Sequence, residues 1–328
     1  MTKNAKMEIN LKTCIIILNY NNVEDTIKCI DSIERINTAA IKYIVVDNNT
    51  PQKQKIEILS EYLEQKFGVN YRLVHEGEEY DPILPYITLL LSSTNDGYAK
   101  GNNKGLLLAE NDPEVHNILI LNNDILFVED IIPALEKYYY SIPDIGILSP
   151  MLCKNDLSLD LRCARKNTNI YIETIKKLLN YTLVVTKIDL NQNQYLVKKE
   201  NEVKELMEIQ LPSGSCMFIN KKLFADIGFF DPNTFLYVEE NILYKKLHRL
   251  GKKNFLCGKL KCIHLGGAST QHLKSKIFLL KCERDSFAYY WKEYEKHSWL
   301  LILIYRYALF QHRMLYTFIN KYIKKTFS

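Results

Sequence analysis

Four places in the chain carry side chains that can transfer protons or bind cations. They are Asp47-Asn48, Asn122-Asn123-Asp124, Glu239-Glu240 and His264. Carboxylates and imidazoles are common general acids and bases, and they also serve as ligands of divalent cations. Each place alone has an ordinary structural explanation, as a turn residue, a helix N-cap, a solvated first helical turn or a loop histidine. Their joint occurrence, in this order and at the ends of predicted elements, favours one functional site.

The elements that would position these residues alternate between strands and helices. The apolar runs 14–18, 43–46 and 117–121 predict buried strands, and helical spacing over 24–36 and 52–67 follows the first two. This order predicts a parallel sheet with crossover helices. In open α/β sheets, ligands bind at the carboxyl ends of the strands, where the polar residues of this chain gather.

The remaining chain continues the alternation around one irregular stretch. Asn95 to Gly105 is predicted as a glycine-rich polar loop that leads into a helix through Glu110. Residues 155–208 are charged and rich in Asn and Lys, and we interpret them as a variable insertion with a helix over 170–179. Further strands are predicted at 71–74, 87–91, 145–148 and 253–256, with a turn followed by a strand over 211–219 and a strand running into a Gly-Gly loop over 261–269. Further helices are predicted at 131–140, 221–227, 239–250 and 276–294.

Composition excludes some classes of protein. Apolar residues make up 47% and charged residues 25%, as in ordinary globular proteins. The 43 basic and 38 acidic residues give a net charge of +5. The sequence has no dense basic block with interleaved aromatics, the pattern that would predict nucleic-acid binding. The eight cysteines include no C-x-x-C pair, and we interpret them as reduced cytosolic thiols. Zinc held by Cys257, Cys262 and His264 is disfavoured, because the spacing is unusual and a fourth ligand is missing.

Seven segments, spread over residues 13 to 270, resemble one known family. The chain is similar to the inverting glycosyltransferases of the GT-A fold, glycosyltransferase family 2, and especially to the bacterial rhamnosyltransferase-like branch. The segments are I-I-L-N-Y-N (16–21), I-V-V-D-N-N-T (44–50), N-D-G-Y-A-K-G-N-N (95–103), L-N-N-D (121–124), S-G-S-C-M-F-I (213–219), F-L-Y-V-E-E (235–240) and H-L-G-G-A-S (264–269).

The resemblance implies a nucleotide-sugar site. Asp47 would accept a hydrogen bond from the imide N–H of a uracil or thymine ring, and Asn19 and Asn21 would line the nucleotide cleft. The loop from Asn95 to Asn102 would approach the ribose and phosphates, with Gly97 and Gly101 removing side-chain bulk. Asn48 and Asn123 complete the expected donor site.

The resemblance also implies a divalent cation that bridges the donor diphosphate. Asp124 and His264 would be its ligands. An oxygen ligand suits Mg²⁺ or Mn²⁺, and the imidazole nitrogen shifts the preference towards Mn²⁺. The cation would neutralise the charge that develops on the leaving diphosphate.

Inversion at the anomeric carbon needs a base that removes the proton of the acceptor hydroxyl. The family has a Glu-Asp pair at this place, and its second member is the base. This chain has Glu239-Glu240, so Glu240 takes the place of the base and Glu239 supports it. Asn122 replaces the first acid of the common Asp-x-Asp pattern, and Ile242 stands where the family often has another acid.

The resemblance implies an α/β protein with the GT-A fold, a mostly parallel central sheet and a C-terminal helical extension. Residues 1–275 would form the catalytic domain, with a nucleotide-sugar-binding half at 13–150, the insertion at 155–208 and an acceptor and catalytic half at 209–275. Residues 276–328 would form the extension. Within it the apolar run 299–310 is too short to span a bilayer, which needs about 20 residues, so it would either pack on the domain or lie in a membrane interface.

The expected function is transfer of a sugar from a UDP- or dTDP-sugar to a hydroxyl of a glycan or a polyprenyl-diphosphate-linked glycan, in bacterial surface polysaccharide synthesis. The polar first residues and the short run 14–18 carry no signal peptide, which favours a cytoplasmic protein, peripheral at the inner face of the plasma membrane. Two alternatives stay open: a non-catalytic nucleotide-sugar-binding module, and a sugar nucleotidyltransferase. The second lacks a glycine-rich, basic phosphate loop near the N-terminus.

Overall fold

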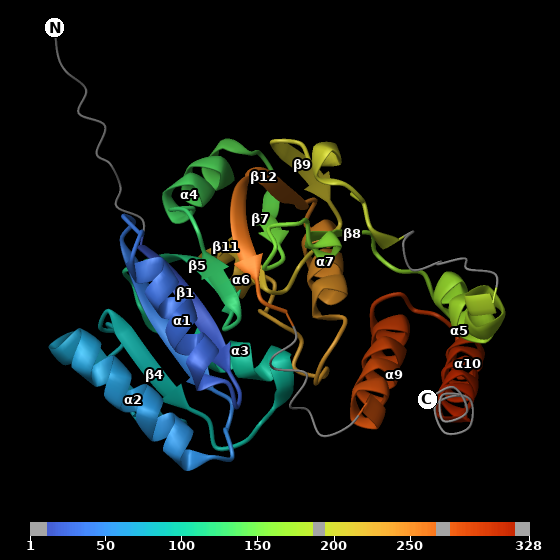
Figure 1. Ribbon diagram of the computed structural model, residues 1–328, viewed down its shortest axis with the longest axis horizontal. Helices are drawn as coiled ribbons and strands as arrows, with labels where there is room; N and C mark the ends of the chain where they lie inside the picture. The colour runs from blue at the N-terminus through green and yellow to red at the C-terminus, as the bar shows by residue number, and fades with distance from the viewer. Residues whose placement is uncertain (1–11, 186–193, 267–275, 319–328) are drawn as a thin grey trace, which may run out of the picture.

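The N-terminal half of the chain forms a parallel sheet, as its buried apolar runs predict. The computed structural model describes residues 12–185, 194–266 and 276–318 (Figure 1). The parallel strands are β1 (Lys12–Asn19), β2 (Ile41–Asp47), β3 (Tyr71–His75), β4 (Ile87–Leu91) and β5 (Val115–Asn122). They lie in the order β3, β4, β2, β1, β5. The register pairs Asn19 with Asp47 and Leu18 with Asn122, so the polar ends of β1, β2 and β5 meet at one edge.

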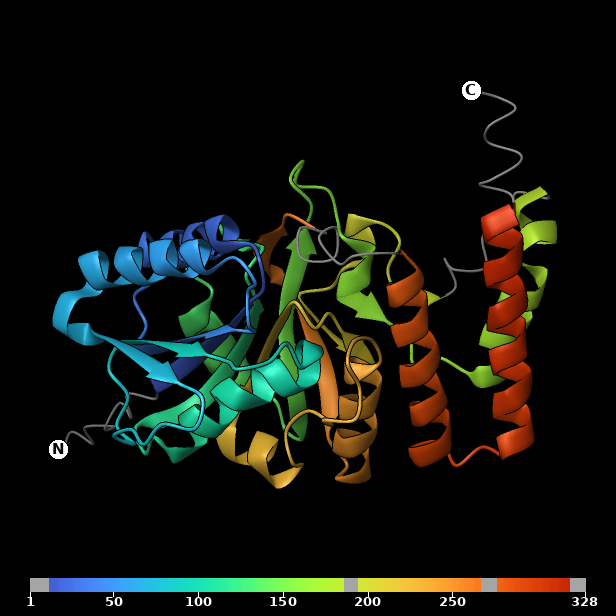
Figure 2. The ribbon, with the colours of Figure 1, turned by 90° about the horizontal axis from the view of Figure 1, so that it is seen from below.

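Helices cover both faces of this sheet, because its strands are apolar on both faces. One face packs against α1 (Val23–Glu34), α2 (Lys53–Phe67) and α4 (Ile132–Ser141). The other face packs against α3 (Gly97–Asn111), α6 (Lys221–Asp226) and α7 (Glu239–Arg249). The two layers are seen edge-on in Figure 2.

Beyond β5 the sheet becomes mixed. β11 (Cys216–Asn220) is antiparallel to both β5 and β7 (Ile145–Cys153), and β12 (Lys253–His264) is parallel to β7. β6 (Ile125–Phe127) and β9 (Leu206–Ile209) pair antiparallel with β12, and β8 (Ala164–Arg165) pairs with β10 (Leu211–Pro212) in a separate ladder. Short 3-10 turns occur at η1 (Gly68–Asn70), η2 (Leu161–Cys163) and η4 (Glu200–Glu202).

The predicted glycine-rich loop at 95–105 is wrong for most of its length, because α3 begins at Gly97. Its glycines serve close packing of the helix on the sheet. A Cβ atom on Gly101 would lie 2.7 Å from Leu18 Cδ1, and one on Gly105 would lie 2.9 Å from Val46 Cγ2. The two glycines therefore allow α3 to approach β1 and β2 closely, which a helix with larger side chains could not do.

Other element boundaries also differ from the prediction. The two strands predicted at 253–256 and 261–269 are one strand, β12, which ends at His264, and residues 267–269 lie outside the described residues. The predicted insertion at 155–208 contains α5 (Ile170–Val185) as expected, but it also contributes β8, β9 and η2 to the body of the protein.

The C-terminal extension forms α9 (Lys276–Glu293) and α10 (Trp299–Phe318), and α10 packs against both α9 and α5. Their shared core contains Trp291, Tyr305 and Leu309, together with Val238 and Ile242 at the start of α7. Ile242, where the resembled family often has an acid, is therefore a core residue. None of the helices in the described part of the chain is both long and apolar enough to cross a membrane.

Candidate active site

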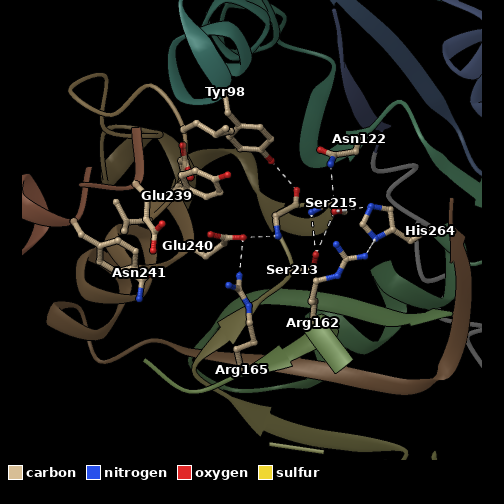
Figure 3. A pocket seen from close by; sticks show the side chains of 16 residues that line it. Tyr98, Asn122, Arg162, Arg165, Ser213, Ser215, Glu239, Glu240, Asn241 and His264 are labelled. Atoms are coloured by element: carbon tan, nitrogen blue, oxygen red, sulfur yellow. Dashed lines mark hydrogen bonds and ion pairs between the residues drawn. The ribbon is translucent and has the colours of Figure 1, made fainter. Parts of the chain in front are cut away.

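Two adjoining cavities open where the polar strand ends meet α7. The larger has a volume of about 480 Å³ and includes Glu239, Glu240 and His264 in its wall (Figure 3). The smaller, of about 140 Å³, lies over the ends of β1, β2 and β5. Tyr98, Asn122 and Leu236 line both cavities, so a ligand could extend from one into the other.

Glu240 is held in the larger cavity by two hydrogen-bond donors. Arg165 Nη2 lies 2.8 Å from Glu240 Oε1, and the backbone N–H of Gly214 donates to the same oxygen at 3.0 Å. A Cβ atom on Gly214 would lie 3.0 Å from that oxygen, so a larger residue there would crowd the carboxylate. Tyr98 completes the support by donating its hydroxyl to the Gly214 carbonyl at 2.6 Å.

An unusual backbone aims both glutamates at the cavity. Tyr237 and Val238 have φ of +76° and +66°, in the left-handed region that a β-branched residue rarely adopts. Such a conformation costs about 1–3 kcal/mol per residue and is commonly found at functional sites. Val238 is also buried in the core shared with the C-terminal helices, which holds this turn in place. The turn sets Glu239 and Glu240 as the first residues of α7, where the helix dipole favours negative charge.

Glu239 differs from its neighbour in being only 6% exposed. Its Oε1 atom finds no hydrogen-bond partner among the described residues. Burial, and next the charge of Glu240, raises the pKa of Glu239 to about 8. At neutral pH the pair therefore carries a protonated Glu239 beside Glu240.

His264 and Asp124 meet because β12 pairs antiparallel with β6, which places His264 opposite Ile125. His264 Nε2 lies 3.5 Å from Asp124 Oδ2, and His264 Nδ1 lies 3.1 Å from Asp160 Oδ2. Burial lowers the pKa of His264, but its contacts with the two carboxylates outweigh burial and raise the pKa to about 9. A metal ion would displace the Nε2 proton, while Asp160 would fix the ring through Nδ1.

The Asp124 and His264 side chains fit a divalent cation. Asp124 Oδ1 is buried and has no hydrogen-bond partner among the described residues, so one carboxylate oxygen is left for a ligand beside the imidazole. No group of three or more His, Cys, Asp or Glu residues arranged for a metal occurs in the described ranges. The protein thus offers two ligands, and the other coordination positions would need oxygens from a bound ligand or from water.

Asn48 organises the smaller cavity. Its amide Nδ2 donates to Asn95 Oδ1 and to the Gly97 carbonyl, both at 3.0 Å. Gly97 has φ of +80°, and a Cβ atom there would lie 2.0 Å from the Phe235 carbonyl oxygen, so only glycine fits. Asn123 also lines this cavity and donates to the Asn22 carbonyl at 3.0 Å. Asn48, Asn95, Gly97 and Asn123 are therefore brought together as the sequence predicts.

The other predicted donor residues line neither cavity. Asp47 is 2% exposed, and its carboxylate accepts hydrogen bonds from Asn19 Nδ2 at 2.9 Å and from the hydroxyl and N–H of Thr50. Asn19 is fully buried in this network, and Asn21 takes part through its backbone N–H, which donates to Thr50. Gly101 and Asn102 lie buried within α3. These residues lie beneath the edge of the site and do not line either cavity.

Several residues of the two cavities were not predicted from the sequence. Arg162 and Arg165 line the larger cavity, Asp160 contacts His264, and Tyr20 and Tyr98 line the smaller one. The first three belong to the stretch interpreted as a variable insertion. Its weak periodicity gives no signal that separates these charges from solvated ones. The tyrosines lie inside matched segments, so only their side-chain role was missed.

No family model matches the chain, and no curated protein matches it in sequence. Among the solved structures that match its fold are two glycosyltransferases. The crystal structure of GalNAc-T7 with UDP, GalNAc and Mn²⁺ matches with a TM-score of 0.57 and 14% identity, over 88% of this chain and 49% of that chain. The mannosyltransferase PcManGT from Pyrobaculum calidifontis, in complex with GDP-Man and Mn²⁺, matches with a TM-score of 0.51 and 11% identity, over 94% of this chain and 75% of that chain.

These matches define the class of the fold. The protein has the GT-A fold, with a mostly parallel central sheet flanked by helices and with helices at the C-terminal end. This confirms the fold class predicted from the sequence. The chain spans about half the length of the GalNAc-T7 chain that it matches.

Proposed function

We propose that the protein is an inverting glycosyltransferase that uses a UDP- or dTDP-sugar donor and a divalent cation. The observation that carries this proposal is the placement of Glu240. Its carboxylate is fixed in a cavity that shares three lining residues with a second cavity at the carboxyl ends of the strands, where open α/β sheets bind ligands. Glu240, which is positioned to accept a proton, therefore lies beside a cavity that could hold the nucleotide-sugar donor.

We assign the nucleotide to the smaller cavity and the cation to Asp124 and His264. Tyr20 offers an aromatic face, and the amides of Asn48, Asn95 and Asn123 offer hydrogen bonds. Both matched structures are named with Mn²⁺ and a nucleotide or nucleotide sugar, which supports this assignment. When bound, the cation supplies positive charge that stabilises the departing diphosphate. Recognition of a uracil or thymine by Asp47 would require its carboxylate to leave part of the Thr50 network.

The residues of the larger cavity would act on the acceptor. Glu240 takes the proton of the acceptor hydroxyl as that oxygen bonds to the anomeric carbon, and the bond from the anomeric carbon to the diphosphate breaks with its electron pair going to the diphosphate. Arg165 and the Gly214 N–H keep the Glu240 carboxylate in one position. Glu239, protonated at neutral pH, adds no second charge that would oppose this geometry.

The finer parts of the proposal concern biological setting. We propose a glycan or a polyprenyl-diphosphate-linked glycan as acceptor, in bacterial surface polysaccharide synthesis, with the protein peripheral at the inner face of the plasma membrane. Membership of glycosyltransferase family 2 and its rhamnosyltransferase-like branch, and the division into a catalytic domain at 1–275 and an extension at 276–328, rest on the sequence segments quoted above.

Release of free nucleotide from a panel of UDP-, dTDP-, GDP- and ADP-sugars, with and without Mn²⁺, tests the proposal. We expect slow, Mn²⁺-dependent hydrolysis of a UDP- or dTDP-sugar in water, and faster release when a suitable acceptor is added. A non-catalytic binding module would bind one of these donors without releasing nucleotide under any condition. Release that favours ADP-sugars, or that ignores the cation, would contradict the proposal.

A further inference from the structure

The end of the protein away from the parallel sheet exposes an extended apolar surface. Figure 2 shows α10 in red and α5 in green side by side at this end, and the two helices are in contact. The exposed side chains of this surface, which we call the apolar face, are Tyr171, Ile172, Ile175, Leu178 and Leu179 of α5, and Trp299, Leu300, Leu303, Ile304, Tyr307, Phe310, Met314 and Leu315 of α10.

On α10 the exposed and the buried apolar residues occupy different sides. Ile302, Tyr305 and Leu309 enter the core shared with α9. Trp299 is 75%, Tyr307 63% and Phe310 58% exposed, although burial would favour each of them strongly. A contiguous exposed patch of this kind marks an interaction site.

A cationic groove borders the apolar face. A cavity of about 310 Å³ between α9 and α10 is lined by Lys281, Arg284, Arg306 and Arg313, with Asp285 as the acidic residue among them. Asp285 is paired with Arg284. Phe310 belongs both to this groove and to the apolar face, so the two surfaces are continuous.

The sequence of the C-terminal segment is basic. From Trp299 to the last residue the chain contains no Asp or Glu, and its basic residues there are Arg306, Arg313, Lys321, Lys324 and Lys325. An exposed apolar helix face flanked by Arg and Lys, with Trp and Tyr among its residues, is complementary to the surface of an anionic bilayer. A second protein copy would have to accept the same cationic rim against its own.

We propose that the apolar face docks on an anionic lipid bilayer, with α10 lying in the interface and lipid phosphates entering the groove between α9 and α10. The same α9 that forms the groove also presents Glu283 and Phe287 to the larger active-site cavity. The bilayer and the cavity therefore lie on two sides of one helix. The inference rests on the proposed function for the membrane setting and the lipid-linked acceptor, and it adds the surface and the kind of lipid that would bind.

Vesicle co-sedimentation of the full chain tests the proposal. We expect binding to vesicles of phosphatidylcholine mixed with phosphatidylglycerol, weaker binding to phosphatidylcholine alone, and a loss of binding as salt is raised. The double variant Tyr307→Ser, Phe310→Ser should bind about tenfold or more weakly, because two side chains no longer enter the interface. Arg306→Gln with Lys281→Gln should weaken binding to anionic vesicles alone.

Matched controls lie elsewhere on the surface. Ile58→Ser removes an equally exposed apolar side chain on α2, and Lys222→Gln removes an exposed charge on α6, so both should bind as the native protein does. Melting temperature and donor hydrolysis should stay unchanged in all these variants, because none of the altered residues lines an active-site cavity. Glu240→Gln should bind vesicles normally, which separates lipid binding from catalysis.

Four outcomes would overturn the proposal. The first is that the native protein binds neither kind of vesicle. The second is that Ile58→Ser weakens binding as much as the double variant does. The third is a dimer that the double variant Tyr307→Ser, Phe310→Ser dissociates, which would mean that a second copy covers the apolar face. The fourth is that inorganic phosphate binds in the groove while the protein binds no vesicles, which would make the groove a site for a free anion. Intact donor hydrolysis in any of these cases would leave the proposed sugar-transfer activity standing without its membrane setting.

Discussion

Arg165 and Glu240 form an ion pair, with 2.8 Å between Arg165 Nη2 and Glu240 Oε1, across the wall of the larger cavity. The two residues lie 75 positions apart in the sequence. Arg165 comes from the short strand β8, and Glu240 from the first turn of α7. The pair holds the Glu240 carboxylate in the cavity wall, beside the Glu239 side chain, which is almost fully buried.

Glu240→Gln should lower sugar transfer by about 10²–10⁴-fold, the usual contribution of a general base, and should leave donor affinity nearly unchanged. Glu239→Gln is the matched control. Because glutamine resembles the protonated carboxyl that Glu239 carries below its pKa of about 8, this variant should keep most of its activity at neutral pH. Steady-state transfer rates and donor titrations measure both. An inactive Glu239→Gln beside an active Glu240→Gln would move the base to Glu239.

Arg165→Gln should lower kcat by about 10–100-fold and change the donor KM little. The guanidinium positions Glu240, and Arg165 does not line the smaller cavity to which we assign the nucleotide. Arg165→Lys should recover part of the rate, since it keeps the charge but loses the planar fork. A KM that rises with kcat unchanged would instead assign Arg165 to substrate binding.

Glu239 should also shape the pH dependence of stability. Its pKa is raised in the folded protein from 4.5 to about 8, so the folded state holds a proton that the unfolded state has released between these values. The resulting stabilisation is complete below about pH 4.5 and is lost as the pH rises through about 8. Glu239→Gln lacks this dependence. We expect the free energy of unfolding of the native protein to fall relative to that of Glu239→Gln between pH 5 and 8, by an amount on the order of a few kcal/mol, and its melting temperature to fall with it. Parallel melting curves would contradict the buried, protonated state.

Gly101→Ala should destabilise the fold by about 1–3 kcal/mol, the usual cost of overpacking. The added Cβ atom would meet Leu18 Cδ1 at 2.7 Å and the Asn48 amide at 3.2 Å. Lys100→Ala, at the exposed neighbouring position of α3, is the control and should be neutral or slightly stabilising. Urea unfolding of the three proteins measures the difference. Equal midpoints would show that α3 does not depend on glycine for its close contact with the sheet.

The sequence predicted the sheet better than the site. Strands such as β1 and β4 were located because buried apolar runs fix both their length and their faces. The start of α3 was missed, because glycines that permit close packing have the same composition as glycines that make a loop. Asp47 and Asn19 lie at the ends of neighbouring strands, as predicted, but they line neither cavity. Their hydrogen bonds to each other and to Thr50 depend on side-chain orientation, which spacing does not determine.

The contribution of residues 155–208 could not be predicted for a different reason. Arg165 reaches Glu240, and Asp160 reaches His264, only because β8 pairs with β10 and because η2 follows β7. These are long-range contacts in a segment with little periodicity. The C-terminal run showed the opposite problem: it is apolar on all sides, so the sequence alone could not separate the residues that pack on α9 from those that stay exposed.

The central claim is that the smaller cavity binds a nucleoside diphosphate through a cation held by Asp124 and His264. Calorimetric titration of UDP, dTDP, GDP and ADP, with and without Mn²⁺, tests this claim most directly. We expect UDP or dTDP to bind at least about tenfold more tightly with Mn²⁺ than without it, and more tightly than GDP or ADP. Asp124→Asn and His264→Ala should remove the Mn²⁺ dependence while keeping a cooperative melting transition. Equal affinity for all four nucleotides, or a Mn²⁺ effect that survives in Asp124→Asn, would contradict the claim.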